Sequence, residues 1–136
     1  MAAVSDEILT KLKNAARKVS DNAYTPYSHF PVGAAVLGGS GKIYAGCNVE
    51  NASFGLTICA ERNAVFSAIA GGEKKIIAIA LYTPTDSKTP PCGACRQVIY
   101  EFNTQTEVYI FNRTDDLLKT NIQELLPAAF GPDDIL

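Results

Sequence analysis

The sequence has no long apolar run and little net charge, and these shortages narrow what the protein can do. No run approaches the ~20 apolar residues that a membrane-spanning helix requires. The segment from Met1 to Glu7 has neither a basic start nor an apolar core, so we expect no secretory signal and a cytoplasmic location. A net charge of −2 argues against a nucleic-acid polymer as the main partner, because phosphate binding draws on clustered Lys and Arg.

Histidine and cysteine are also scarce. The one histidine, His29, has no second histidine or acid at ligand spacing, so we expect it on the surface rather than at a metal. Four cysteines in a chain without an export signal are a poor basis for a disulfide framework. Cys47 and Cys59 stand apart, whereas Cys92 and Cys95 form a C-x-x-C pair. This spacing suggests metal binding or redox chemistry.

The pattern of apolar residues predicts one α/β domain over residues 1–136, with three layers and a mixed central sheet of about five strands. The chain is 47% apolar and shows no repeat or long linker, and a domain of this length can bury roughly two-thirds of its unfolded surface. A first helix follows the N-cap Ser5, and later helices begin near Cys59 and Cys92. The remaining expected elements are strands at Val32–Leu37, Lys42–Glu50, Ile76–Leu81 and Glu107–Asn112 and a short helix at Ile122–Leu126.

The second expected strand alternates cleanly between apolar and polar residues. Side chains of a strand point alternately to its two faces, so Asn48 and Glu50 share a face close to its carboxyl end. Cys47 falls on the apolar face, where a small buried hydrophobe is the commoner role for cysteine.

Two of the cysteines, Cys59 and Cys92, fall at expected helix N-termini. The backbone N–H groups and the helix dipole there favour the thiolate, which is the form that binds zinc. Cys92 and Cys95 are three residues apart and share one face of the first helical turn. Three thiolates leave a fourth tetrahedral position open, which distinguishes a catalytic zinc from a structural one.

Two other interpretations fit the same cysteines. A lone C-x-x-C before a helix is typical of a thioredoxin-like redox pair, although a third cysteine followed closely by an acid favours a metal. A closed structural zinc would need Cys47 as the fourth ligand, which its place on the apolar face disfavours.

Glu61 and Arg62 follow Cys59 in the same helical turn. A glutamate there can simply complement the helix dipole, or it can act as a general acid–base beside a zinc-bound water whose pKa the metal lowers from ~16 to ~7. Arg62 is either an exposed helix charge or a group that donates to the sulfurs and offsets their negative charge.

Together these motifs resemble the cytidine deaminases, in the short form with three cysteine ligands. The resemblance extends over nearly the full chain. It is carried by Cys59-Ala60-Glu61-Arg62, by Pro91-Cys92-Gly93-Ala94-Cys95-Arg96-Gln97, by the segments 24–34 and 46–52, and by Glu124-Leu125-Leu126-Pro127 with Phe130-Gly131-Pro132. Two positions depart from the pattern: Pro90 stands where serine is frequent, and Phe54 stands where tyrosine is frequent.

The resemblance implies a role for each matching position. Cys59, Cys92 and Cys95 would bind one Zn²⁺ per subunit, and Glu61 would move the proton. The substrate would contact the Ala60 backbone, the ribose-binding residues Asn48 and Glu50, Phe30 on the base, and Phe130 from a neighbouring subunit of a homotetramer.

The function implied is zinc-dependent hydrolysis of cytidine and 2'-deoxycytidine to uridine and 2'-deoxyuridine, with release of ammonia, as in pyrimidine salvage. Glu50 favours free nucleosides, because a carboxylate facing the ribose would repel an attached phosphate. Three alternatives are a deaminase of a cytidine-like nucleoside antibiotic of the blasticidin type, a polynucleotide-binding or editing subunit, and a purely structural zinc module.

Overall fold

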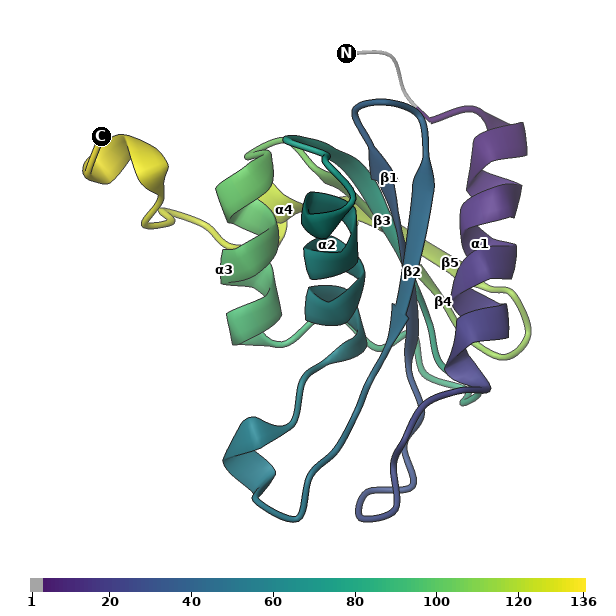
Figure 1. Cartoon of the computed structure of the whole chain (residues 1–136). Coiled ribbons are helices and arrows are strands. Elements are labelled where there is room, and N and C mark those ends of the chain that lie inside the picture. The colour runs from purple at the N-terminus through teal and green to yellow at the C-terminus, as the bar shows by residue number, and fades with distance from the viewer. Residues whose placement is uncertain (1–3) are drawn as a thin grey trace.

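A five-stranded sheet lies between two layers of helices in the computed structural model, which describes residues 4–136 (Figure 1). The mixed α/β architecture is the predicted one. The strands are β1 (Gly33–Gly38), β2 (Ile43–Cys47), β3 (Ile76–Tyr82), β4 (Glu107–Phe111) and β5 (Leu117–Asn121). The helices are α1 (Asp6–Ser20), α2 (Ala60–Ala70), α3 (Gly93–Phe102) and α4 (Ile122–Leu125), with 3-10 turns at Phe54–Leu56 and Pro132–Asp134.

The strand order across the sheet is β2-β1-β3-β4-β5. β1 pairs antiparallel with both β2 and β3, β4 pairs antiparallel with β5, and the central β3–β4 pair is parallel. A parallel pair needs a crossover, and α3 supplies it. The carboxyl ends of β3 and β4 therefore lie at the same edge of the sheet.

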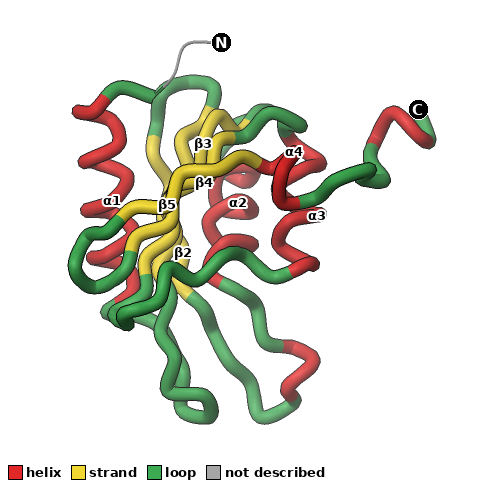
Figure 2. The backbone as a smooth tube through the Cα atoms, turned by 180° about the vertical axis from the view of Figure 1, so that it is seen from behind, coloured by secondary structure: helices red, strands yellow, loops and turns green. Residues whose placement is uncertain are grey.

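The helices divide between the two faces, α1 on one and α2, α3 and α4 on the other (Figures 1 and 2). On the first face the fully buried Leu12 and Ala16 of α1 form a cluster with sheet residues, which are Ala35, Leu37, Ala78, Ala80, Tyr82, Tyr109 and Phe111. The second face holds a larger core, which comprises Ala34, Val36, Ala60, Ala64, Val65, Ala68, Ile76, Ile79, Leu81, Ile99, Val108, Ile110 and Ile122. Both faces of the central strands are covered, which is why Ile76–Leu81 is continuously apolar.

The ends of several elements differ from the expectations. α1 begins at its expected cap, where the Ser5 hydroxyl accepts from the Ile8 N–H at 3.2 Å, and it ends at Ser20. β2 stops at Cys47, and beyond it only Val49 makes isolated bridges, to Tyr24 and Ile58. β5 has no counterpart among the individual strands expected from the sequence.

The expected absence of a leader concerns Met1–Ala3 in part, and those residues lie outside the described ones. Within residues 4–136, no helix combines the length and the apolarity needed to cross a membrane.

Gly46 lets α2 lie directly against β2. A Cβ atom at this position would come within 2.4 Å of the Ala64 backbone nitrogen and 2.8 Å of the Asn63 carbonyl carbon. The Asn63 amide also donates to the Cys47 carbonyl at 2.8 Å. This close approach fixes the distance between the sheet and the helix that begins after Cys59.

Gly46→Ala should therefore destabilise the fold, because helix backbone has to move to admit the methyl group. We expect the free energy of unfolding to fall by about 1–3 kcal/mol, measured by urea denaturation. Gly39→Ala is the matched control, because its added Cβ would meet Lys75 at an ordinary 3.7 Å. Equal stability of the two variants would contradict this close packing.

Candidate metal centre and active site

Three sulfur atoms converge at the edge of the sheet where α2 and α3 begin. The Sγ atoms of Cys59, Cys92 and Cys95 lie within 4.8 Å of one another, with Cys59 to Cys92 at 3.9 Å and Cys92 to Cys95 at 3.4 Å. Zinc–sulfur bonds of ~2.3 Å in a tetrahedron put neighbouring sulfurs about 3.8 Å apart. All four cysteines are free, and Cys47 is not in the cluster. The donor set and its spacing therefore fit one zinc ion with three thiolates.

Two of the three sulfurs, those of Cys59 and Cys92, lie at helix N-termini, where anions are stabilised. Cys59 is the N-cap of α2 and Cys92 the N-cap of α3, and their carbonyls accept the first helical hydrogen bonds from Asn63 and Arg96. Helix N-termini carry partial positive charge, which favours a thiolate. Cys95 lies one turn further along α3 and is fully buried.

Contacts within the cluster shift the thiol pKa values apart. Hydrogen bonds from Cys95 and from Arg62 lower the pKa of the Cys59 thiol to about 5. The hydrogen bond to Cys59 and burial raise the pKa of Cys95. The Arg62 guanidinium donates to the Cys59 sulfur at 3.3 Å, and this contact raises the pKa of Arg62 in turn. Arg62 is therefore a partner of the sulfur cluster rather than an exposed helix charge.

Glu61 lies in the same first turn of α2 and is only 6% exposed. Burial raises the pKa of its carboxyl to about 7, and the neighbouring negative charge of Cys59 adds to this effect. A dipole-complementing surface glutamate would be solvated, so the burial of Glu61 favours the acid–base interpretation. A carboxyl whose pKa is near neutral can both accept and return a proton.

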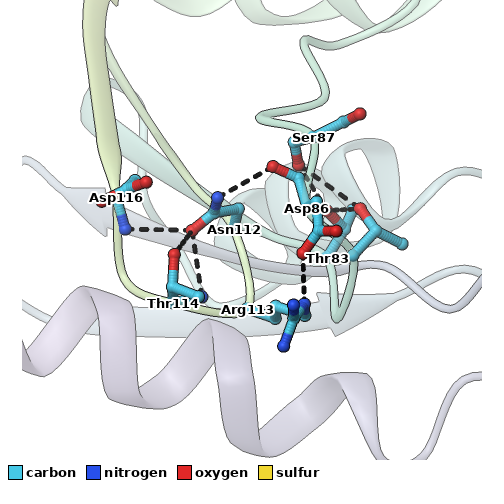
Figure 3. A network of polar contacts seen from close by, with 8 residues as sticks. Thr83, Asp86, Ser87, Asn112, Arg113, Thr114 and Asp116 are labelled. Carbon is cyan, nitrogen blue, oxygen red and sulfur yellow. Dashed lines mark hydrogen bonds and ion pairs between the residues drawn. The ribbon is translucent and has the colours of Figure 1, made fainter.

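A polar network holds the loop that leads from β3 to Cys92 (Figure 3). The buried Asn112, at the end of β4, donates to the Asp86 carbonyl at 2.9 Å, while its own oxygen accepts from backbone N–H groups of the β4–β5 turn. Thr83, 2% exposed, donates to the Ser87 carbonyl at 3.3 Å. These hydrogen bonds anchor the loop to the parallel pair of strands, and the anchored part lies just ahead of Cys92 in the chain.

A cavity of about 290 Å³ lies beside Glu50, which follows the end of β2. Val49 and Ile58 exchange two backbone hydrogen bonds of 3.0 and 3.1 Å, and this bridge sets Glu50 close to the segment that ends in Cys59. The rings of Tyr27 and Phe54 meet edge to face at 5.6 Å. The lining residues are Tyr27, Ser28, Glu50, Phe54 and Thr57.

Asn48 and Glu50 both bind the backbone of the loop between α1 and β1. The Asn48 side chain accepts from the Val32 N–H and donates to the Phe30 carbonyl, both at 2.9 Å. Glu50 accepts from the N–H groups of Tyr27 and Ser28 at 3.0 and 3.1 Å. A further hydrogen bond, from the Ser28 hydroxyl, holds the pKa of Glu50 below its usual range.

The other sequence-predicted residues fall in different places. Ala60 is buried as the first residue of α2, and Phe30 is half-buried in the loop that Asn48 holds. His29 is exposed, as expected, with φ 57°. Phe130 is 60% exposed in the C-terminal segment, which extends away from the sheet (Figure 1), and it does not line the Glu50 cavity.

Sequence reasoning missed Tyr27, Ser28 and Thr57 as lining residues, and it noted Phe54 only as a departure from a family pattern. Tyr27 and Ser28 lie in a turn, and nothing in their spacing indicates that they meet a carboxylate more than twenty residues away. Segment 24–34, which carries part of the family resemblance, was the one sequence signal that included them.

Comparisons with known proteins agree with the donor set. A family model described as the cytidine and deoxycytidylate deaminase zinc-binding region matches residues 6–111. The cytidine deaminase of Sporosarcina psychrophila is 46% identical over 126 residues, covering 92% of this chain and 93% of that protein. That of Halalkalibacterium halodurans is 47% identical over 116 residues, covering 85% of this chain and 88% of that protein.

Solved structures show the same similarity. The crystal structure of cytidine deaminase from Burkholderia pseudomallei matches with a TM-score of 0.86 at 45% identity, covering 93% of this chain and all of that one. The cytidine deaminase structure from Mycobacterium tuberculosis matches with a TM-score of 0.82 at 36% identity, covering 95% of this chain and all of that one.

Cys59→Ala should abolish tight zinc binding, because it removes one of three converging sulfurs, whereas Cys47→Ala should leave it intact. The measurement is the zinc content of each purified variant after dialysis, with circular dichroism as the check on folding. Full zinc retention by Cys59→Ala, or loss from Cys47→Ala, would contradict this ligand set.

Proposed function

The chain belongs to the cytidine and deoxycytidylate deaminase family, and we propose that it hydrolyses free cytidine and 2'-deoxycytidine to uridine and 2'-deoxyuridine with release of ammonia. The observation that carries this function is the convergence of three sulfurs on the helical turn that holds a buried glutamate. A cavity with a carboxylate in its wall supports it, because Thr57, which lines that cavity, is two residues before Cys59. A thioredoxin-like redox pair needs two sulfurs, whereas three converge here. A closed structural zinc would need a fourth protein ligand.

Cys59, Cys92 and Cys95 would hold the zinc ion, which supplies Lewis acidity that makes water a nucleophile at neutral pH. Three thiolates bring a negative charge that weakens this acidity. Arg62, through its 3.3 Å contact with the Cys59 sulfur, offsets part of that charge. The same contact holds the sulfur in position at the start of α2.

Glu61 is the proposed proton carrier. Its carboxylate takes a proton from the attacking water and gives it to N3 of the pyrimidine ring, and it then helps to protonate the amino group that leaves from C4. Water and cytidine thereby give uridine and ammonia, with no oxidant or second substrate. Burial beside the sulfurs keeps bulk water from competing for this proton.

Asn48 and Glu50 are the proposed ribose-binding residues. Glu50 has about four acceptor positions and already receives three hydrogen bonds from the loop, so one position is left for a sugar hydroxyl. Asn48 uses one of its two N–H groups on the Phe30 carbonyl and keeps the other. A hydroxyl both donates and accepts, so it can satisfy the two groups together. Phe30 would pack on the base, and the Ala60 backbone would contact it.

The proposal also covers the domain, the compartment and the assembly of subunits around the site. Residues 1–136 act as one catalytic domain of a cytoplasmic enzyme of pyrimidine salvage. The subunits form a homotetramer in which Phe130 reaches the site of a neighbour; its ring is exposed and the Gln97 amide holds its carbonyl at 2.8 Å. Phe54, which contacts Tyr27 in the cavity wall, bears on substrate preference rather than on the reaction.

Glu61→Gln should abolish nearly all turnover while leaving fold and zinc in place, because the amide cannot carry the proton. We expect the turnover number for cytidine to fall at least about 10²–10⁴-fold, followed by the absorbance change of the pyrimidine. Glu101→Gln, an exposed change on α3, is the control. Unchanged activity of Glu61→Gln would remove this residue from the reaction.

Cytidine should be turned over as the free nucleoside, and cytosine in single-stranded RNA or DNA should not be. Glu50 faces the proposed ribose position, so a phosphate attached there would meet a carboxylate. The assay compares cytidine with a cytosine-containing oligonucleotide at equal base concentration, with and without a zinc chelator. Efficient deamination of the oligonucleotide would contradict the free-nucleoside assignment.

A further inference from the structure

The hydroxyl of Ser28 connects two residues of the proposed substrate site through one oxygen atom. It donates to Oε2 of Glu50, and its oxygen accepts from the Phe30 N–H at 3.1 Å. Ser28 is exposed and lies in the wall of the cavity. We propose that Ser28 is a positioning residue, which orients the Glu50 carboxylate toward the ribose hydroxyls of the substrate; this role rests on the proposed function.

The direction of the Ser28 proton follows from the contacts around it. A serine hydroxyl has a single hydrogen and two acceptor positions. The Phe30 N–H can only donate, so it occupies one acceptor position and the hydrogen is left for Glu50. A carboxylate accepts well from a hydroxyl, and such charge-assisted bonds are stronger than neutral ones. The hydroxyl therefore has one settled orientation.

This hydrogen bond restrains the carboxylate of Glu50 where the backbone contacts alone do not. The N–H groups of Tyr27 and Ser28 both bind Oε1, so they act on one oxygen only. The Ser28 hydroxyl holds the other oxygen, Oε2, and thereby fixes rotation of the carboxylate plane. The acceptor position that remains for a sugar hydroxyl is then held in one direction before substrate binds, which reduces the entropy cost of binding.

The same oxygen couples the sugar side of the site to the base side. Phe30 is the residue proposed to pack on the pyrimidine, and its backbone is held by Ser28 through the N–H and by Asn48 through the carbonyl. The residue between them, His29, has φ 57°, a backbone conformation that favours glycine and costs energy in other residues. Such a turn persists when the contacts on both sides of it hold, as they do here.

A second serine–glutamate pair elsewhere in the chain provides a matched control. Ser40 donates to Glu73 through both its N–H and its hydroxyl, and the Ser40 oxygen accepts from the Lys42 N–H at 3.3 Å. This pair has the same chemistry as Ser28 with Glu50, but it ties the β1–β2 hairpin to the segment after α2 and takes no part in the site. Removal of the Ser40 hydroxyl reports what losing such a pair costs the fold alone.

The experiment measures KM and kcat for cytidine, and the inhibition constant of 2',3'-dideoxycytidine against cytidine, in wild type, Ser28→Ala, Ser28→Thr and Ser40→Ala. The dideoxy compound lacks the hydroxyls that Glu50 would bind, and its inhibition constant reports affinity whether or not it is deaminated. In Ser28→Ala we expect KM for cytidine to rise about tenfold, which corresponds to about 1.4 kcal/mol. We expect kcat and the inhibition constant to stay within about twofold, because Ser28 does not touch the reacting atoms and Asn48 still holds the Phe30 backbone through its carbonyl when the Ser28 hydroxyl is lost. Ser28→Thr keeps the hydroxyl and should restore KM, and Ser40→Ala should leave all three constants unchanged.

The double variant Ser28→Ala with Glu50→Gln tests whether Ser28 acts through Glu50. Once Glu50 is an amide, loss of the Ser28 hydroxyl should raise KM no further, so the two effects are not additive. Equal losses for cytidine and the dideoxy compound, additive effects in the double variant, or an unchanged KM in Ser28→Ala would overturn the positioning role. A wild-type protein that does not deaminate cytidine would defeat the proposed function instead, and this is read before any variant is compared.

Discussion

The meeting of two helix N-termini at one edge of the sheet is the constraint on which the site depends. α2 and α3 each lead into a strand of the central parallel pair, so both helices begin at the carboxyl edge of that pair. Cys59 and Cys92 cap these helices, and Cys95 follows one turn later. Three sulfurs from two segments 33 residues apart thereby come within 4.8 Å of one another, and two of them lie at helix N-termini that favour their anions.

The surroundings of the sulfurs divide the electrostatic tasks. Arg62 offsets negative charge from one side, while Glu61 is buried on the same turn and kept out of water. The two neighbours in sequence thus have different parts at the cluster: Arg62 balances its charge, and Glu61 is the proposed proton carrier. The close contact at Gly46 and the polar network around Asn112 hold the two ligand-bearing segments from opposite ends.

The Glu50 cavity is connected to the sulfur cluster through the backbone. The bridge between Val49 and Ile58 ties the residues after β2 to the segment that reaches Cys59, so Glu50 and the sulfurs are parts of one framework. Glu50, Ser28 and Asn48 form a second layer of hydrogen bonds over the loop that carries Phe30. The proposed substrate contacts therefore depend on a loop that the proposed binding residues themselves hold.

The sequence predicted much of this arrangement, and the failures have local causes. Continuous apolar residues identified β3, and the cysteines with the helical pattern after them located the starts of α2 and α3. The strand β5 was not predicted, because Leu117, Leu118 and Lys119 are all exposed at the sheet edge and show no alternation. The expected strand to Glu50 was too long, because beyond Cys47 the backbone leaves β1, and Asn48 and Glu50 form backbone hydrogen bonds with Tyr24 instead. The contact of Ser28 with Glu50 depends on tertiary structure and leaves no periodic trace in the sequence.

X-ray absorption spectroscopy of the zinc-loaded protein tests the central claim most directly, because it counts the sulfur atoms around the metal. The account predicts three sulfur scatterers at about 2.3 Å and one lighter oxygen or nitrogen scatterer. Four sulfurs, or two or fewer, would contradict it.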